Sequence, residues 1–116
     1  METKHAIAAL GALAQETRLS IYRLLVERGP EGLAAGGIAE KLDLPPSSLS
    51  FHLAQLTHAG LILQRRESRS LIYSVDFAAM GSLMGYLTEN CCGGNAAACL
   101  PACDVSTPAL KKRKSA

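Results

Sequence analysis

Hydrophobic residues recur at helical spacing along most of the chain. From Lys4 to Leu13 they fall three residues apart, which predicts a short helix whose apolar stripe is made of Ile7, Leu10 and Leu13. A stronger pattern follows over residues 16–28, where apolar positions cover a wide face until Gly29-Pro30 ends the periodicity. We therefore expect two consecutive helices before residue 30.

Two shorter apolar runs then lie on either side of a turn that contains Pro45-Pro46. Their members are Ile38, Ala39 and Leu42 in the first run, and Leu49, Leu53 and Leu56 in the second. Two short helices that meet across a tight turn form the helix-turn-helix pattern. Pro46 suits the first position of the second helix, and we expect Ser47 and Ser48 to cap the exposed amides of its first turn.

The polar residues of this second helix are candidates for DNA contact. If its three leucines face the core, its other faces carry hydrogen-bonding side chains, which are those of Ser47, Ser48, Ser50, His52 and Gln55. Such side chains let a helix approach phosphates and base edges in the major groove, where Gln pairs with adenine. Taken alone, the pattern also fits the solvated face of a helix in any small helical domain.

A hairpin is predicted directly after this helix, which Gly60 ends. Two β-rich runs, Leu61–Arg65 and Leu71–Val75, surround a charged centre. Three arginines, Arg65, Arg66 and Arg69, cluster at or near the tip, where a phosphate backbone would attract them. The expected fold is therefore mainly α with a β-hairpin, a winged helix-turn-helix. This favours DNA binding over an interaction module that uses the same fold without an operator.

The last periodic segment predicts a helix that begins after Asp76, a suitable N-cap. One side of it carries large apolar residues, which are Phe77, Met80, Leu83, Met84 and Leu87. This stripe is larger than a small core requires. Together with the first helix it predicts the interface of a homodimer, whose two-fold symmetry would match an operator with two half-sites. Packing of the stripe on its own core is the alternative.

Length and composition place these elements in one domain, residues 1–90, followed by a tail of residues 91–116. The domain carries 8 basic and 9 acidic residues, so its net charge does not by itself indicate nucleic acid. No apolar run approaches the roughly 20 residues that cross a bilayer, and the first residues lack the pattern of a secretory signal. We expect a cytoplasmic protein without a membrane partner.

All four cysteines lie in the tail, at Cys91, Cys92, Cys99 and Cys103. In a reducing compartment, clustered cysteines are more often metal-binding or reactive than disulfide-bonded. No histidine is near them in the sequence to activate a nucleophile, so we do not expect an enzyme.

Three stretches of the chain resemble the ArsR/SmtB family of bacterial metal- and metalloid-responsive repressors. They are LGALAQETRLSIYRLLVE, SSLSFHLAQLTHAGLI and RRESRSLIYSV, within residues 6–90. The resemblance implies a homodimeric winged helix-turn-helix protein that represses its operon until an inducer binds. The family's cysteine pair before the recognition helix is missing from IAEKLDL, and no histidines lie between Asp76 and Asn90. What remains is similar to the arsenical sensors with ENCC at the end of the last helix and a further cysteine downstream.

The resemblance implies trivalent arsenic or antimony as the inducer ligand. These centres favour three sulfur ligands, of which Cys91 and Cys92 would supply two. The third is Cys99, which is nearer the spacing of the similar subgroup, or Cys103. Zinc held by all four cysteines is an alternative, although structural zinc sites usually separate their ligands. A thiol redox switch and unliganded cysteines are further alternatives. The basic stretch Lys111–Lys114 either adds non-specific DNA affinity or is a solvated terminus.

Overall fold

The computed structural model describes residues 1–89, so the four cysteines and the basic stretch lie outside the described residues. Its helices are α1 Thr3–Leu13, α2 Glu16–Arg28, α3 Ala35–Leu42, α4 Pro46–His58 and α5 Phe77–Leu87, with a short 3₁₀ turn η1 at Gly29–Glu31. Its strands are β1 Leu33–Ala34, β2 Ile62–Glu67 and β3 Ser70–Val75. The predicted fold class, mainly α with a β-hairpin, is confirmed.

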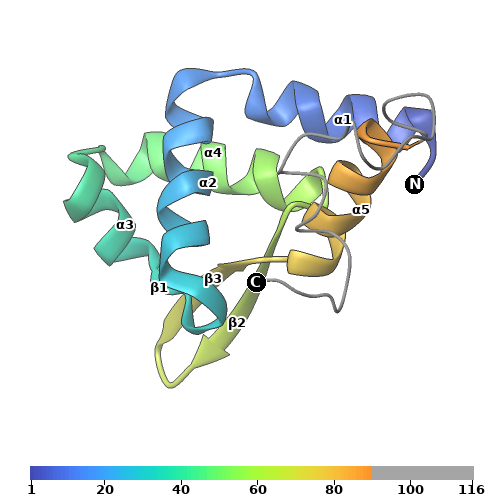
Figure 1. The fold of residues 1–116 in the computed structure, drawn as a ribbon. Helices are drawn as coiled ribbons and strands as arrows, with labels where there is room; N and C mark the ends of the chain where they lie inside the picture. The colour runs from blue at the N-terminus through green and yellow to red at the C-terminus, as the bar shows by residue number, and fades with distance from the viewer. Residues whose placement is uncertain (90–116) are drawn as a thin grey trace.

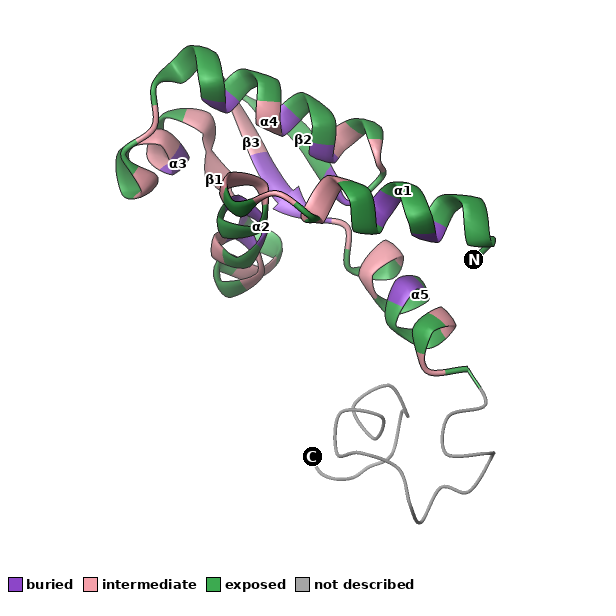
Figure 2. Cartoon of the chain, turned by 90° about the horizontal axis from the view of Figure 1, so that it is seen from above, coloured by how far each residue is buried: buried purple, intermediate pink, exposed green. Residues whose placement is uncertain are grey.

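The helices enclose a core that is built mainly by α2, α3, α4 and the start of β2. Its fully buried large side chains are those of Ile21, Leu25, Ile38, Leu56, Leu61 and Ile62. In Figure 1 α2 stands across α4, α3 lies at one end, the hairpin extends below, and α1 and α5 lie next to each other at the other end. Figure 2 shows the buried segments of α1, α2, α4 and the sheet turned toward the middle of the molecule. No helix within residues 1–89 is long and apolar enough to span a membrane.

The turn between α3 and α4 differs from the prediction in its capping. The α3 helix ends at Asp43 in the left-handed conformation with φ 54°, and α4 begins at Pro46. The N-cap is Pro45, and no side chain caps this end. The prediction that Ser47 and Ser48 cap it was wrong because Pro46 takes the first helical position. Both serines then lie inside the helix, beyond the position from which a hydroxyl reaches the free amides.

The sheet has three antiparallel strands in the order β1-β3-β2. The hairpin pairs Ile62 with Val75 at its base and Glu67 with Ser70 at its end. Its predicted arms are confirmed, with Arg65 inside β2 as the first arm predicted. β2 also includes Arg66, and of the three arginines only Arg69 is in the connecting turn. The third strand, β1, was not predicted. It is two residues long and pairs with Tyr73 and Ile72 of β3.

Helix α1 faces the core with a side that its apolar spacing did not predict. Ala6 and Ala9 are buried, whereas Ile7 is 63% exposed and Leu10 is 42% exposed. Small side chains let the α1 backbone approach its neighbours closely, so the larger residues point outward. Of the expected stripe, only Leu13 packs against the core, where it is partly buried. Ile7 and Leu10 do not belong to the face that covers the core of their own chain.

Candidate nucleic-acid interface

Helix α4 presents one buried and one exposed face. Leu49, Leu53 and Leu56 are buried against the core. Four of the five predicted DNA-contacting residues of this helix are exposed, namely Ser47, Ser48, Ser50 and Gln55. The structure thus places these hydrogen-bonding side chains on the surface of the second helix of the helix-turn-helix, where contact with a groove requires them.

The fifth predicted residue of α4, His52, is only partly exposed. Its Nδ1 atom is buried and has no hydrogen-bond partner within residues 1–89. Its ring lies edge-on to the ring of Phe51, with the ring centroids 5.7 Å apart and the planes at 67°. His52 therefore lies at the border between the core and the exposed face of α4.

The arginines of the wing, which is the β2–β3 hairpin, fall into two groups. Arg66 and Arg69 are exposed, and neither forms a salt bridge within the part of the chain that the structure describes. Arg65 is instead tied to the body of the protein. Its Nε atom donates to Glu67 Oε2 at 2.8 Å, and its terminal nitrogens donate to the carbonyl oxygens of Pro30, at 3.4 Å, and Glu31, at 2.7 Å. Arg65 therefore fixes β2 against η1, which leaves Arg66 and Arg69 available for phosphate groups.

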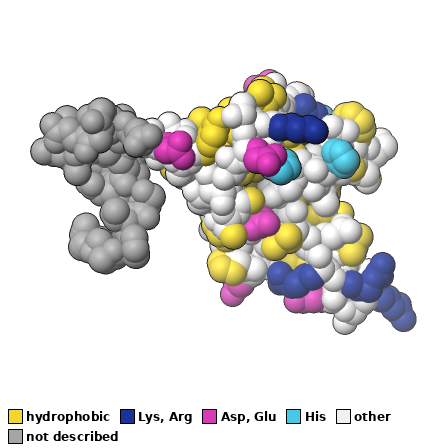
Figure 3. Space-filling model, turned by 90° about the vertical axis from the view of Figure 1, so that its right-hand side faces the viewer, with side chains coloured by type: hydrophobic (Ala, Val, Ile, Leu, Met, Phe, Trp, Pro, Cys, Tyr) yellow, Lys and Arg dark blue, Asp and Glu magenta, His cyan; other side chains and the backbone are white. Residues whose placement is uncertain are grey.

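A second surface is formed by helices α1 and α5 at the end opposite α3. We call it the α1–α5 apolar face, and its exposed members are Ile7, Leu10, Phe77, Met84 and Leu87. Figure 3 shows apolar side chains in patches over this side, with Lys and Arg side chains projecting at the lower edge, where the wing lies. A hydrogen bond between the hydroxyl groups of Thr3 and Tyr86 joins the start of α1 to the last turn of α5. The exposed apolar residues of the two helices thus lie at the same end of the molecule.

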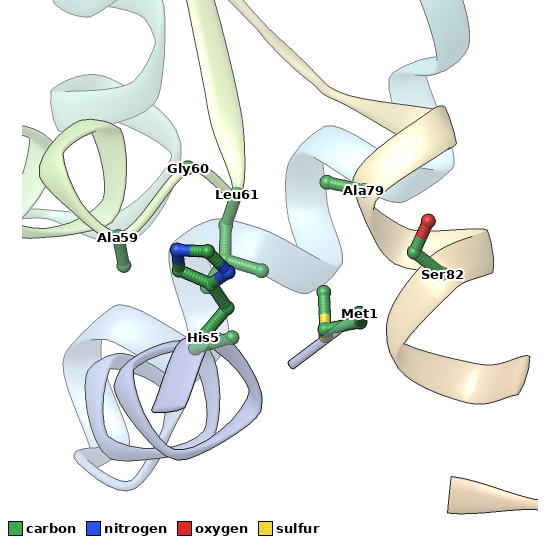
Figure 4. A pocket seen from close by; sticks show the side chains of 8 residues that line it. Met1, His5, Ala59, Gly60, Leu61, Ala79 and Ser82 are labelled. Carbon is green, nitrogen blue, oxygen red and sulfur yellow. The ribbon is translucent and has the colours of Figure 1, made fainter. Parts of the chain in front are cut away.

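A hollow of about 270 Å³ lies where α1, the turn after α4 and α5 meet. Figure 4 shows the side chains of His5 and Ser82 at its wall among the smaller apolar groups. These are the two polar side chains among its lining residues, which are Met1, His5, Ala9, Ala59, Gly60, Leu61, Ala79 and Ser82. Within residues 1–89 no cluster of three or more His, Cys, Asp or Glu residues could hold a metal ion. The predicted cysteine site lies outside this range.

Sequence reasoning missed one residue of the α4 surface. Phe51 is 58% exposed, although an aromatic residue in a helical pattern usually belongs to the core. The signal that could have found it is its spacing, because it stands four residues from both Ser47 and Gln55 and therefore shares their face.

Comparisons with known proteins agree with this geometry. A protein-family model described as a helix-turn-helix domain matches residues 13–65 of this chain. The Vibrio cholerae protein named "Transcriptional activator HlyU" is 31% identical over 90 residues, which cover 78% of this chain and 81% of that protein. Its solved structure has a TM-score of 0.59 at 34% identity and covers 75% of this chain and 97% of the other. A second structure of it, titled in the reduced form, has a TM-score of 0.58 at 33% identity and covers 73% and 90%.

Two further proteins are also similar to this chain. The Halobacterium salinarum protein named "Putative arsenical resistance operon repressor ArsR" is 40% identical over 63 residues, 54% of this chain but only 48% of that protein. A homodimeric winged helix-turn-helix DNA-binding domain from Mycobacterium bovis has a TM-score of 0.60 at 24% identity, and the match covers 80% of this chain and 86% of that one. At this identity the likeness concerns the fold alone.

The exposed second helix and the wing define this molecule as a winged helix-turn-helix protein of the kind that regulates transcription. The relatives are transcriptional regulators of the same architecture. The chain belongs to the ArsR/SmtB family of these regulators.

Proposed function

We propose that this protein is a homodimeric repressor that binds operator DNA and is released when trivalent arsenic or antimony binds its cysteines. The observation that carries the DNA-binding part is the exposure of Ser47, Ser48, Ser50 and Gln55 on α4 beside the exposed wing residues Arg66 and Arg69. The helix supplies groups that read base edges, and the wing supplies cations that attract phosphates. Repression, rather than the activation named for the Vibrio relative, follows from the resemblance to the arsenical sensors.

The α1–α5 apolar face supports the homodimer. A monomer would leave Ile7, Leu10 and Leu87 exposed to water at one end of the molecule, and exposed apolar side chains that gather on one side are typical of an interface. A two-fold interface uses the same patch on both copies, so α1 and α5 of one protomer would pack on those of its partner. Two α4 helices would then reach two half-sites of one operator.

The inducer part of the proposal is supported by the chemistry of the four thiols. Trivalent arsenic and antimony bind three sulfur ligands. Cys91 and Cys92, together with Cys99 or Cys103, would provide such a set. The first two of these cysteines follow shortly after α5 in the sequence, and α5 carries part of the proposed dimer interface. To empty a nearly saturated operator, inducer binding must favour the DNA-free dimer by about 5 kcal/mol. A change in how the two α5 helices are held is the proposed route from the cysteines to the operator.

A thiol redox response is a second candidate function. The observation that favours it is the solved structure titled as the reduced form of HlyU from Vibrio cholerae. In this mechanism, a peroxide would oxidise two of the cysteines to a disulfide, taking up their two electrons and two protons as it is reduced to water, and the oxidised dimer would leave its operator.

Fluorescence anisotropy of a labelled fragment of the promoter upstream of the gene tests the whole proposal. The labelled fragment is titrated with the reduced protein. Separate samples of the complex are then titrated with arsenite, antimonite, zinc or hydrogen peroxide. Release by arsenite or antimonite alone is the expected result. Release only by zinc or only by peroxide would reject the metalloid part and leave the repressor.

Cysteine variants locate the site. A Cys91→Ser/Cys92→Ser double variant should bind the operator with unchanged affinity and should no longer respond to arsenite. Single Cys99→Ser and Cys103→Ser variants then identify the third ligand, because only one of them should abolish the response. If the double variant still released DNA on addition of arsenite, the proposed cysteine site would be wrong.

A further inference from the structure

The exposed aromatic ring of Phe51 is the feature of α4 that hydrogen-bonding readout does not explain. It is two residues from both Leu49 and Leu53, and two residues correspond to about 200° around a helix. Phe51 therefore points away from the core, and its exposure of 58% agrees with this placement. Phe51 belongs neither to the core of residues 1–89 nor to the partly buried residues packed against it.

The neighbours of Phe51 make it the dominant side chain of that surface. The residues three and four positions away are its neighbours on a helix. Here they are the exposed residues Ser47, Ser48, Ala54 and Gln55. Three of these four side chains are much smaller than a phenyl ring. The ring therefore projects beyond them, and any surface that α4 approaches will meet it.

The orientation of the ring is supported by His52. The two rings lie edge to face with centroids 5.7 Å apart, an arrangement in which aromatic pairs attract each other. His52 itself is partly buried, so its ring lies between the core and the exposed ring of Phe51. This contact restricts the exposed ring on one side, and a side chain that is restricted before binding loses less entropy when it binds.

The chemistry of the major groove determines what such a ring can recognise. A phenyl group offers no hydrogen-bond donor or acceptor of ordinary strength, so it does not pair with base nitrogen or oxygen atoms. The apolar group that the four natural base pairs present in this groove is the 5-methyl group of thymine, and Phe is among the residues that contact it. We propose that Phe51 is a specificity-determining residue that reads the methyl group of one thymine in each operator half-site.

This inference rests on the proposed function, since it requires α4 to enter the major groove of an operator. The experiment first locates the operator by footprinting on the gene's own promoter. Each thymine of a half-site is then replaced in turn by deoxyuridine, which removes the methyl group and keeps the base pair. Dissociation constants are measured by anisotropy for the wild-type protein, for Phe51→Ala and for Leu19→Ala, which removes an exposed apolar side chain from α2.

At one thymine per half-site, replacement by deoxyuridine should raise the dissociation constant. Loss of its methyl group should weaken wild-type binding about fourfold for one half-site and about 15-fold for both, as expected for the burial of one methyl group each. Phe51→Ala should bind the thymine and deoxyuridine operators equally, because the shorter alanine side chain does not reach the methyl group. Leu19→Ala should keep the full wild-type response.

The possible outcomes separate the two proposals. Operator binding that is indifferent to every methyl group overturns the role of Phe51 and leaves the repressor intact. A methyl response that persists in Phe51→Ala also overturns it, since another residue then reads that thymine. Failure of the wild-type protein to prefer its promoter over unrelated DNA overturns the proposed function itself. The deoxyuridine series needs only the wild-type chain, so poor folding of a variant does not prevent the test.

Discussion

Among single residues, two glycines with nearly the same backbone geometry have different surroundings. Gly29 has φ 75° and ψ −158°, and Gly32 has φ 73° and ψ −163°. This region is almost restricted to glycine. A Cβ atom on Gly29 would meet nothing within 4 Å, whereas one on Gly32 would lie 2.3 Å from the carbonyl oxygen of Tyr73. Gly32 is therefore required both for its conformation and for the close approach of β3.

Alanine substitutions should separate these two requirements. Gly29→Ala should lower the free energy of unfolding by about 1–3 kcal/mol through backbone strain alone. Gly32→Ala adds a clash with a backbone atom that cannot move without disturbing the β1–β3 pairing, so it should cost about 2 kcal/mol more. Urea unfolding followed by circular dichroism measures both values. Equal decreases in the two variants would show that the contact with Tyr73 does not constrain this turn.

A buried tyrosine connects α2 to the start of α5. Burial, and to a smaller extent the negative charge of Asp76, raises the pKa of Tyr22 above its ordinary value of 10.0. Asp76 also accepts a hydrogen bond from the amide of Ala79 at 3.1 Å and so caps α5. The carboxylate of Asp76 therefore begins the last helix and adds to the effect of burial on the pKa of Tyr22.

Among the helices and strands, the wing is a hairpin that is attached to η1 partway along β2, with its connecting turn beyond this attachment. The bonds from Arg65 to the carbonyl oxygens of Pro30 and Glu31 join β2 to η1, which are far apart in the sequence. Arg69 occupies the turn beyond this attachment. The two arginines should therefore act differently in DNA binding, one through the position of the wing and the other through direct contact with phosphate.

Substitution of each arginine by alanine tests this division. Arg69→Ala should leave stability within about 0.5 kcal/mol, because it removes an exposed side chain. It should also reduce the slope of log affinity against log salt by about 0.9 for each phosphate that the variant no longer neutralises. Arg65→Ala should lower the free energy of unfolding by up to about 1 kcal/mol, since its bonds are partly exposed to solvent, and should change the salt slope little.

Anisotropy titrations between about 50 and 300 mM salt, together with urea unfolding, provide both readouts. A lower salt slope for Arg65→Ala, equal to that of Arg69→Ala, would mean that Arg65 exchanges its internal partners for phosphate when DNA binds. The sequence-based assignment of Arg65 to the DNA-contacting group would then hold in full.

The elements within residues 1–89 were largely predictable, and the exceptions have physical reasons. The spacing of apolar residues identified the five α-helices of residues 1–89, because each helix buries side chains at helical spacing. Strand β1 was not predicted because two residues are too few to show the alternation of apolar and polar positions that indicates a strand. In α1 the spacing showed a stripe around Ile7, but spacing does not tell whether the stripe meets its own core or another chain. Phe51 was missed for the same reason, since an apolar residue inside a helix does not reveal its partner.

The candidate site was predicted less completely than the fold. The polar positions of α4 follow from the placement of Leu49 and Leu53, because the opposite face of a helix is then determined. The attachment of Arg65 depends on contacts with Pro30 and Glu31, which lie 35 and 34 positions away in the sequence, and no local pattern encodes them. The cysteine site lies outside the described residues and stays a prediction.

In the whole molecule, the proposed dimer surface and the proposed DNA-binding surface occupy different regions. The α1–α5 apolar face lies at one end, and the wing extends from the lower side in Figure 1. A dimer that uses the first surface would leave α4 and the wing of both protomers free. In such a dimer, assembly and DNA contact would not compete.

A charge placed in the α1–α5 apolar face should separate the protomers. Met84→Glu buries a carboxylate in the proposed interface, so the variant should be a monomer at micromolar concentration and should bind the operator at least about 100-fold more weakly. Leu19→Glu on α2 is the matched control, because Leu19 is 43% exposed and Met84 is 41% exposed. Sedimentation equilibrium gives the assembly state of each. A dimeric Met84→Glu variant would place the interface elsewhere.

The exposed ring of Phe51 also has a spectroscopic consequence. The sequence contains no tryptophan. A tryptophan in place of Phe51 would therefore be the sole indole of the chain, and its exposure in the free protein would give it the red-shifted emission of a solvated fluorophore. Contact with a base edge would shift that emission to the blue and quench it. The tryptophan emission would therefore measure the binding of α4 in the groove without any label on the DNA.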